Sequence, residues 1–129
     1  MRTIHWGRVA LGVIAAEAVP IVLLVIIVAV FGPREQTSAQ QFATRLGQWV
    51  GPIGGDIMSF IAALWVARKS NQRRILHGTL VGVGSAVLDV GLIAISGAGF
   101  EWLFVVSNAG RVAAGWLGGL TADAFRRRT

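Results

Sequence analysis

Four long runs of mostly apolar residues, at 9–31, 49–67, 75–95 and 100–125, constrain this chain more than any other feature. An α-helix needs about 20 residues to cross the hydrocarbon core of a bilayer, and each run is about that long. Backbone polar groups inside lipid must be satisfied within the segment, so such runs form helices rather than open strands. The sequence therefore predicts an all-α integral membrane bundle of four transmembrane helices, with 1–129 as a single domain.

The composition agrees with a membrane protein. Charged residues make up 14% of the chain and hydrophobic residues 54%, whereas a soluble domain carries about 25% charged residues. The absence of cysteine excludes disulfides and thiolate chemistry. A net charge of +6 is also typical of nucleic-acid binding, but these basic residues flank the apolar runs, where membrane orientation explains them. We expect the lipid bilayer as a partner and no nucleic acid.

The distribution of Lys and Arg predicts how the protein sits in its membrane. One side carries nine basic residues: Arg2, Arg8, Arg68, Lys69, Arg73, Arg74, Arg126, Arg127 and Arg128. The other side carries Arg34 and Arg45. By the positive-inside rule both termini and the loop at 68–74 are cytoplasmic, in the bacterial cytoplasmic (inner) membrane. The loop residues Arg68, Lys69, Arg73 and Arg74 are then placed to meet anionic lipid.

The one long polar stretch, 32–48, separates the first two runs. Apolar residues recur at helical spacing over 38–50, which indicates either an amphipathic helix on the outer surface or an extension of helix two. Proline lacks an N–H for the carbonyl four residues earlier, and glycine loosens a helix, so both favour bends. The candidate hinges are Pro20, Gly51, Pro52, Gly54 and Gly55.

Small residues recur on one face of three predicted helices, which in lipid lets helix backbones approach closely. On helix two the face holds Gly51, Gly55, Ser59 and Ala63. On helix three it holds Gly78, Gly82, Ser85 and Asp89, and on helix four Asn108, Arg111, Gly115 and Gly119. This pattern predicts tight helix packing but no particular chemistry.

Four ionisable residues, Glu17, Asp56, Asp89 and Arg111, fall inside the predicted spans. Each costs about 2.5–3.5 kcal/mol at a helix centre, so such residues face the bundle and pair. Asp89 follows Arg74 by 15 residues and Arg111 precedes Arg126 by 15, so both lie about 22 Å from the inner edge. Because helices three and four are consecutive and antiparallel, we predict an Asp89–Arg111 pair.

Glu17 and Asp56 have only Arg111 as a buried cation to share. Burial and mutual repulsion both favour the neutral form of at least one of these carboxyl groups. Pro20 also leaves the carbonyl of Ala16 without its helical partner. The pattern fits either a proton-linked site or a Glu17 that only hydrogen-bonds the freed carbonyl. The candidate intramembrane polar site comprises Glu17, Asp56, Asp89, Arg111, Asn108, Ser85 and Ser59.

One pattern resembles that of small uncharacterised four-helix bacterial membrane proteins. It consists of Gly54-Gly55, Ala67-Arg68-Lys69 and Leu76-His77-Gly78-Thr79-Leu80-Val81-Gly82. The resemblance covers about a quarter of the chain and implies topology only. Glu17, in the first of four helices, also resembles the membrane glutamate of small multidrug transporters. The chain departs from that family in its longer outer loop, its other membrane charges and its strong orientation bias.

Two functions from different classes fit these features. We favour a structural or regulatory membrane subunit, in a homo-oligomer or a hetero-complex, whose charges specify helix pairing. The alternative is a small proton-coupled transporter or channel protomer with a polar midplane site. We expect no enzyme, cofactor or metal site, since no nucleophile–base pair, metal-ligand set or phosphate loop is visible. His5 and His77 both lie at the cytoplasmic edge, which gives no support to a buried haem with two histidine ligands.

Overall fold

The computed structural model describes residues 4–97, 99 and 101–127, which form four α-helices. They are α1 (Trp6–Phe31), α2 (Gln36–Arg68), α3 (Arg74–Ser96) and α4 (Trp102–Arg127). This confirms the all-α four-helix prediction. Within the described residues α1, α2 and α3 are long and apolar enough to cross a membrane, and α4 is not among them. Asn108, Arg111 and several glycines make α4 less apolar than its length suggested.

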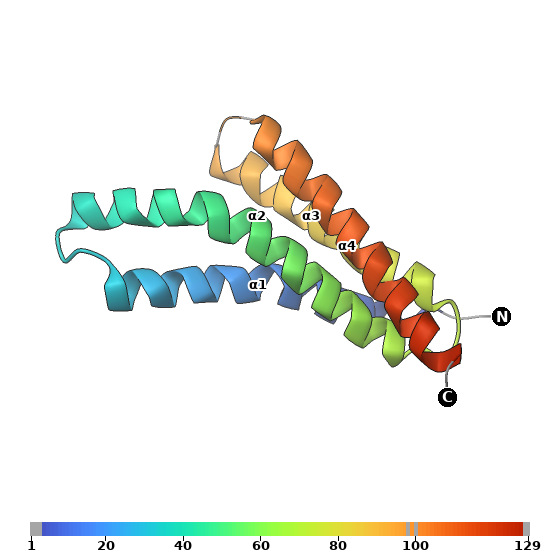
Figure 1. Cartoon of the computed structure of the whole chain (residues 1–129). Helices are drawn as coiled ribbons and strands as arrows, with labels where there is room; N and C mark the ends of the chain where they lie inside the picture. The colour runs from blue at the N-terminus through green and yellow to red at the C-terminus, as the bar shows by residue number, and fades with distance from the viewer. Residues whose placement is uncertain (1–3, 98, 100, 128–129) are drawn as a thin grey trace.

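The helices form two hairpins, α1–α2 and α3–α4 (Figure 1). Both chain ends lie at the same end of the bundle as the connection between α2 and α3, and the α1–α2 hairpin extends past the other at the opposite end (Figure 1). Both α2 and α3 pack against α1 and also against α4. The first and last helices therefore lie diagonally across the bundle.

Helix α2 runs without a break from Gln36 to Arg68, so the stretch at 38–50 is an extension of helix two rather than a separate surface helix. Pro52 lies inside it. Figure 1 shows that α2 changes direction near its middle, as expected where Pro52 cannot donate to the carbonyl of Gln48. Pro20 is likewise inside a continuous α1, and a Cβ on Gly54 of α2 would lie 3.4 Å from the Cβ of Pro20.

Glycines bring α3 and α4 into backbone contact, as their spacing predicted. A Cβ on Gly78 would lie 2.7 Å from the Cα of Gly119, and one on Gly82 would lie 2.5 Å from the carbonyl oxygen of Arg111. A Cβ on Gly115 would lie 2.7 Å from the Cα of Gly82. No side chain fits at these distances, so glycine is required for this packing.

Arginines tie the helix ends together near the termini. Arg8 donates to the carbonyl of Lys69 at 2.5 Å, Arg74 to that of Ala122 at 3.0 Å, and Arg126 to that of Asn71 at 2.9 Å. The bonds of Arg8 and Arg126 fasten α1 and α4 to the connection between α2 and α3, and the bond of Arg74 fastens the start of α3 to α4. Arg2 and Arg128, which also entered the orientation argument, lie outside the described residues.

The two histidines meet at this end of the bundle. Their ring centroids are 6.0 Å apart, and His77 is fully buried. Its Nε2 accepts a hydrogen bond from the backbone N–H of His5 at 3.3 Å, and its Nδ1 lies 2.9 Å from the carbonyl oxygen of Arg73. The sequence placed both residues at this edge but did not predict that they touch.

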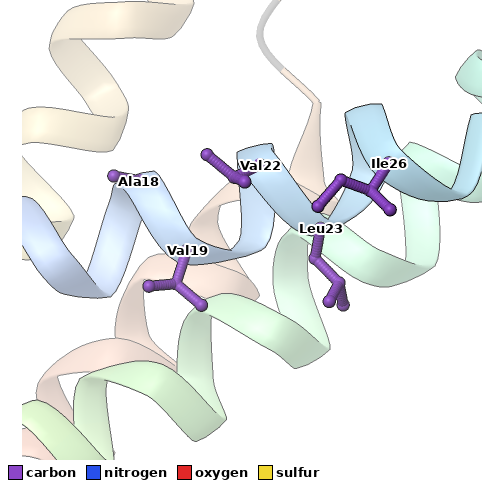
Figure 2. A pocket seen from close by; sticks show the side chains of 5 residues that line it. All are labelled: Ala18, Val19, Val22, Leu23 and Ile26. Carbon is purple, nitrogen blue, oxygen red and sulfur yellow. The ribbon is translucent and has the colours of Figure 1, made fainter. Parts of the chain in front are cut away.

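The outer face of α1 is apolar and exposed. Figure 2 shows a shallow apolar groove on this helix, lined by Ala18, Val19, Val22, Leu23 and Ile26. The larger of these side chains are 43–55% exposed. Exposed Leu, Ile and Val side chains along a whole helix are typical of a surface that faces lipid tails.

Candidate intramembrane polar site

Arg111 of α4 lies at the centre of the candidate site. It is only 4% exposed, and its side chain lies against Gly55 of α2. A Cβ on Gly55 would lie 2.6 Å from Nη2 and 2.8 Å from Nε of Arg111. Gly55 therefore makes room for the guanidinium rather than acting only as a hinge.

Two carboxylates from different helices pair with this guanidinium. Asp89 Oδ2 of α3 lies 2.5 Å from Nη1, which confirms the predicted Asp89–Arg111 pair. Glu17 of α1 lies on the other side, with Oε1 3.1 Å from Nε and Oε2 3.4 Å from Nη2. Because α1 and α4 are on opposite sides of the bundle, the Arg111 side chain connects three helices across its centre.

Asn108, one turn before Arg111, holds Asp89 in place. Its Nδ2 donates to Asp89 Oδ2 at 2.9 Å and to the carbonyl of Phe104 at 2.8 Å. Asp89 thus receives a neutral and a charged donor on the same oxygen. Charge-assisted bonds of this kind are the stronger class of hydrogen bond.

Asp56 enters the same layer without joining the ion pairs recorded among the described residues. Its carboxylate lies against Gly110 of α4, where a Cβ would come within 2.5 Å of Oδ2 and 2.9 Å of Oδ1. Its Oδ1 atom is buried and has no hydrogen-bond partner in the described part of the chain. The sequence identified Asp56 as a candidate, and the structure shows it to be the least compensated of the three acids.

Buried side-chain atoms without hydrogen-bond partners gather in this layer. Within the described residues they are Glu17 Oε1, Asp56 Oδ1, Ser59 Oγ, Ser85 Oγ, Asn108 Oδ1, Arg111 Nε and Arg111 Nη1. The two arginine atoms and Glu17 Oε1 still make ion-pair contacts. Native proteins leave few such groups unsatisfied, so their concentration here keeps these residues as the candidate site. All six residues belong to the predicted site.

Two cavities reach the Asp89–Arg111 pair. The larger, about 270 Å³, opens between α2 and the start of α4, and its lining includes Gln48, Gly51, Pro52, Glu101, Leu103, Phe104 and Ser107. The smaller, about 100 Å³, lies among α1, α2 and α3, and its lining includes Glu17, Pro20, Ile21, Leu24 and Leu92. A proline inside a helix borders each cavity, so both candidate hinges lie near the charged residues.

Three contributors to the site were missed at the level of sequence. Gly110 accommodates Asp56, and Glu101 and Ser107 line the larger cavity. Gly110 directly precedes Arg111, and a glycine beside a membrane charge was a usable signal. Glu101 and Ser107 gave no comparable signal, because their importance depends on how α2 diverges from α4.

The chain matches no protein-family model, no curated protein and no solved structure. In its described part, no three His, Cys, Asp or Glu side chains come together in a way that could hold a metal ion. The side chains of the candidate site carry carboxyl groups, one guanidinium, an amide and hydroxyls. These groups bind and pass protons and form hydrogen bonds with polar solutes.

Proposed function

We propose that the chain is a small proton-coupled transporter or channel protomer with its polar layer as the proton site. The observation that supports this proposal is a charge imbalance in a layer where Glu17 and Arg111 are buried and Asp56 and Asp89 are half-buried. Glu17, Asp56 and Asp89 share one guanidinium, so the layer carries a net charge of −2 when every group is ionised. An uncompensated charge in a low-dielectric site is strongly unfavourable, and binding protons removes it.

Asp56 is the carboxyl group that best fits this role. Glu17 and Asp89 are stabilised as carboxylates by Arg111, whereas Asp56 has a buried oxygen without a hydrogen-bond partner among the described residues. Ser59 and Ser85 are fully buried in the adjoining turns of α2 and α3. Their hydroxyl groups have no hydrogen-bond partner among the described residues, and a hydroxyl can both donate and accept.

The proposal places all four helices in the bacterial cytoplasmic membrane. Helix α4 packs against α2 and α3, both long and apolar enough to cross, so it accompanies them through the bilayer. Pairing of Arg111 with two carboxylates offsets the insertion penalty of α4. The basic end, with both termini, then lies in the cytoplasm by the positive-inside rule.

Single introduced cysteines test this topology, since the chain has none of its own. Thr37 and Gln72 are exposed near opposite ends of α2. An impermeant maleimide added to intact cells should label Thr37→Cys and leave Gln72→Cys unlabelled until the membrane is opened. Labelling of both positions from the outside would contradict the proposed arrangement.

Proton flux tests the function itself. Protein in liposomes with an internal pH dye should respond to an imposed potential with proton entry, and Asp56→Asn and Glu17→Gln should lower that rate at least about tenfold. Asp123→Asn is the matched control, because Asp123 is an acid near the end of α4 that pairs only with the exposed Arg127 among the described contacts. A wild-type rate of proton entry in Asp56→Asn would contradict the proposal.

A structural or regulatory subunit remains the second candidate, and the basic end of the bundle favours it. Arg68, Lys69 and Arg73 are exposed, but Arg68 lies over the Phe125 ring at 4.8 Å, and Arg74 donates to backbone carbonyls. Lys69 and Arg73 are thus best placed to meet anionic lipid or a partner subunit. On this alternative, anionic lipid should raise the melting temperature, Lys69→Gln with Arg73→Gln should abolish the rise, and proton flux should be absent.

A further inference from the structure

The larger cavity carries a carboxylate at each end. Asp89 lies at its inner end beside Arg111, and Glu101 lies at its mouth, just before α4 begins. The recorded contacts of Asp89 with Arg111 and Asn108 both use Oδ2, and 19% of its side chain stays exposed. Another ligand can therefore reach Asp89 through its second oxygen. From this arrangement we propose that the cavity binds a short aliphatic diamine, with one ammonium group at each carboxylate.

The spacing of the two acids sets the length of this ligand. Glu101 precedes Asn108, which donates to Asp89, by seven residues, and the helical rise over seven residues is about 10 Å, so we take about 10 Å as the axial separation of the two acids. A charge-assisted hydrogen bond of about 2.8 Å at each end leaves about 5 Å between the two nitrogens. An extended chain advances about 1.2 Å per bond, so three or four carbons between the nitrogens fit this gap.

The wall between the two acids suits such a molecule. Leu103 and Phe104 offer apolar contact to the methylene groups. Gln48 lines the cavity four residues before Pro52, which cannot donate to its backbone carbonyl, and Asp89 and Glu101 supply carboxylate oxygens. An ammonium group donates three hydrogen bonds and accepts none, which matches this lining.

The nearby cations do not oppose a dication. Arg111 is balanced by Glu17 and Asp89 together, and Asp56 adds further negative charge to the same layer. Arg45 is exposed and lines a neighbouring surface hollow with Thr37 and Gln40 rather than the cavity itself. The diamine would be the substrate of the proposed transporter, so its transport rests on the proposed function, while its binding rests on the cavity alone.

Titration of the purified full-length protein tests the binding. Calorimetry measures the affinity for four ligands: 1,3-diaminopropane, 1,4-diaminobutane, 1,8-diaminooctane and propylamine. The two short diamines should bind more tightly than propylamine and than the eight-carbon diamine. Equal affinity for all four ligands, or no binding of the short diamines, would overturn the proposal.

The variant Glu101→Gln tests the role of the mouth without disturbing the ion pairs. It should weaken the short diamines about three- to fivefold and leave propylamine unchanged, the loss expected for one partly exposed ion pair. Glu35→Gln, which changes an exposed acid at the tip of the other hairpin, should have no effect. Equal losses of diamine affinity in both variants would show a general electrostatic effect rather than binding in the cavity, and would overturn the proposal.

The two proposals fail separately. Proton flux without diamine binding would contradict the proposed ligand but not the proposed proton site. Diamine binding without proton flux in liposomes would support the ligand site and contradict the proposed transporter.

Discussion

The Arg111 layer divides the bundle into two halves that use glycine in opposite ways. In the terminal half, between this layer and the chain ends, Gly78, Gly82 and Gly115 press α3 and α4 together. The other half, which contains the α1–α2 and α3–α4 connections, is called the loop half. There Gly51 has nothing within 4 Å of where a Cβ would stand, and it lines both cavities. The same residue type closes one half and leaves space in the other.

The difference suggests a division of labour. The terminal half has backbone-to-backbone contacts and arginine-to-carbonyl bonds, so it is suited to stay rigid. The loop half has diverging hairpins and the candidate hinges Pro20 and Pro52, so we expect it to change shape more readily (Figure 1). The charged layer lies at the junction, where movement in one half alters access to groups held by the other.

The largest effect on stability should come from breaking the junction. Arg111→Ala leaves Glu17 and Asp89 unpaired and should cost on the order of 3–5 kcal/mol in unfolding free energy. Asp89→Ala should cost less, because Glu17 still pairs with Arg111. Denaturant unfolding in detergent measures both. Arg127→Ala is the control, since its exposed pair with Asp123 contributes at most about 0.5 kcal/mol.

The double change to Leu at positions 89 and 111 sharpens this prediction. It removes both partners of the Asp89–Arg111 pair, but it also takes Arg111 away from Glu17, so stability should recover only in part. Adding Glu17→Gln should complete the recovery. If the changes in unfolding free energy of Asp89→Ala and Arg111→Ala are instead additive, the contact between the two residues contributes nothing to stability.

A methyl group in the terminal half should have the next largest effect. Gly82→Ala places a Cβ 2.5 Å from the carbonyl oxygen of Arg111 and should cost about 1–3 kcal/mol through forced separation of α3 and α4. Gly91→Ala, on the same helix with nothing within 4 Å, is the matched control and should not destabilise. Similar melting temperatures for the two variants would show that α3 and α4 are not closely packed.

Much of the architecture could be predicted because it depends on features local to each helix. The apolar runs defined the helices, the step of the small residues defined the α3–α4 contact, and equal depth in consecutive helices defined the Asp89–Arg111 pair. Each argument needs only helix geometry and the positions of the flanking arginines.

The remaining features depend on how helices tilt and bend. Glu17 follows Arg8 by nine residues, about 14 Å of helical rise, whereas Arg111 is expected about 22 Å from the inner edge. Glu17 nevertheless meets the Arg111 guanidinium, because arginine is long and α1 runs at an angle to the α3–α4 hairpin (Figure 1). Pro52 is compatible with both a break and a bend, so the continuity of α2 was left open. The larger cavity exists only because α2 diverges from α4, which no residue spacing encodes.

A methyl group in the loop half should have a smaller effect of the opposite sign. Gly51→Ala meets no atom within 4 Å and gains helix propensity, so it should stabilise by up to about 1 kcal/mol. It should nevertheless weaken binding of 1,4-diaminobutane, because the methyl group enters the lining of the cavity. Destabilisation as large as that of Gly82→Ala would show that both halves are equally close-packed.

The smallest effect on stability should come from Asp56→Asn. The change removes a carboxyl group with a buried, unpartnered oxygen, so unfolding free energy should shift by less than about 0.5 kcal/mol. Infrared spectra of the wild type at neutral pH should show a protonated carboxyl band that disappears in Asp56→Asn and persists in Glu17→Gln. Loss of the band in Glu17→Gln alone would place the proton on Glu17. Arg111 would then be balanced by Asp56 and Asp89, and the exchangeable proton would lie beside Pro20 of α1 rather than on the bent α2.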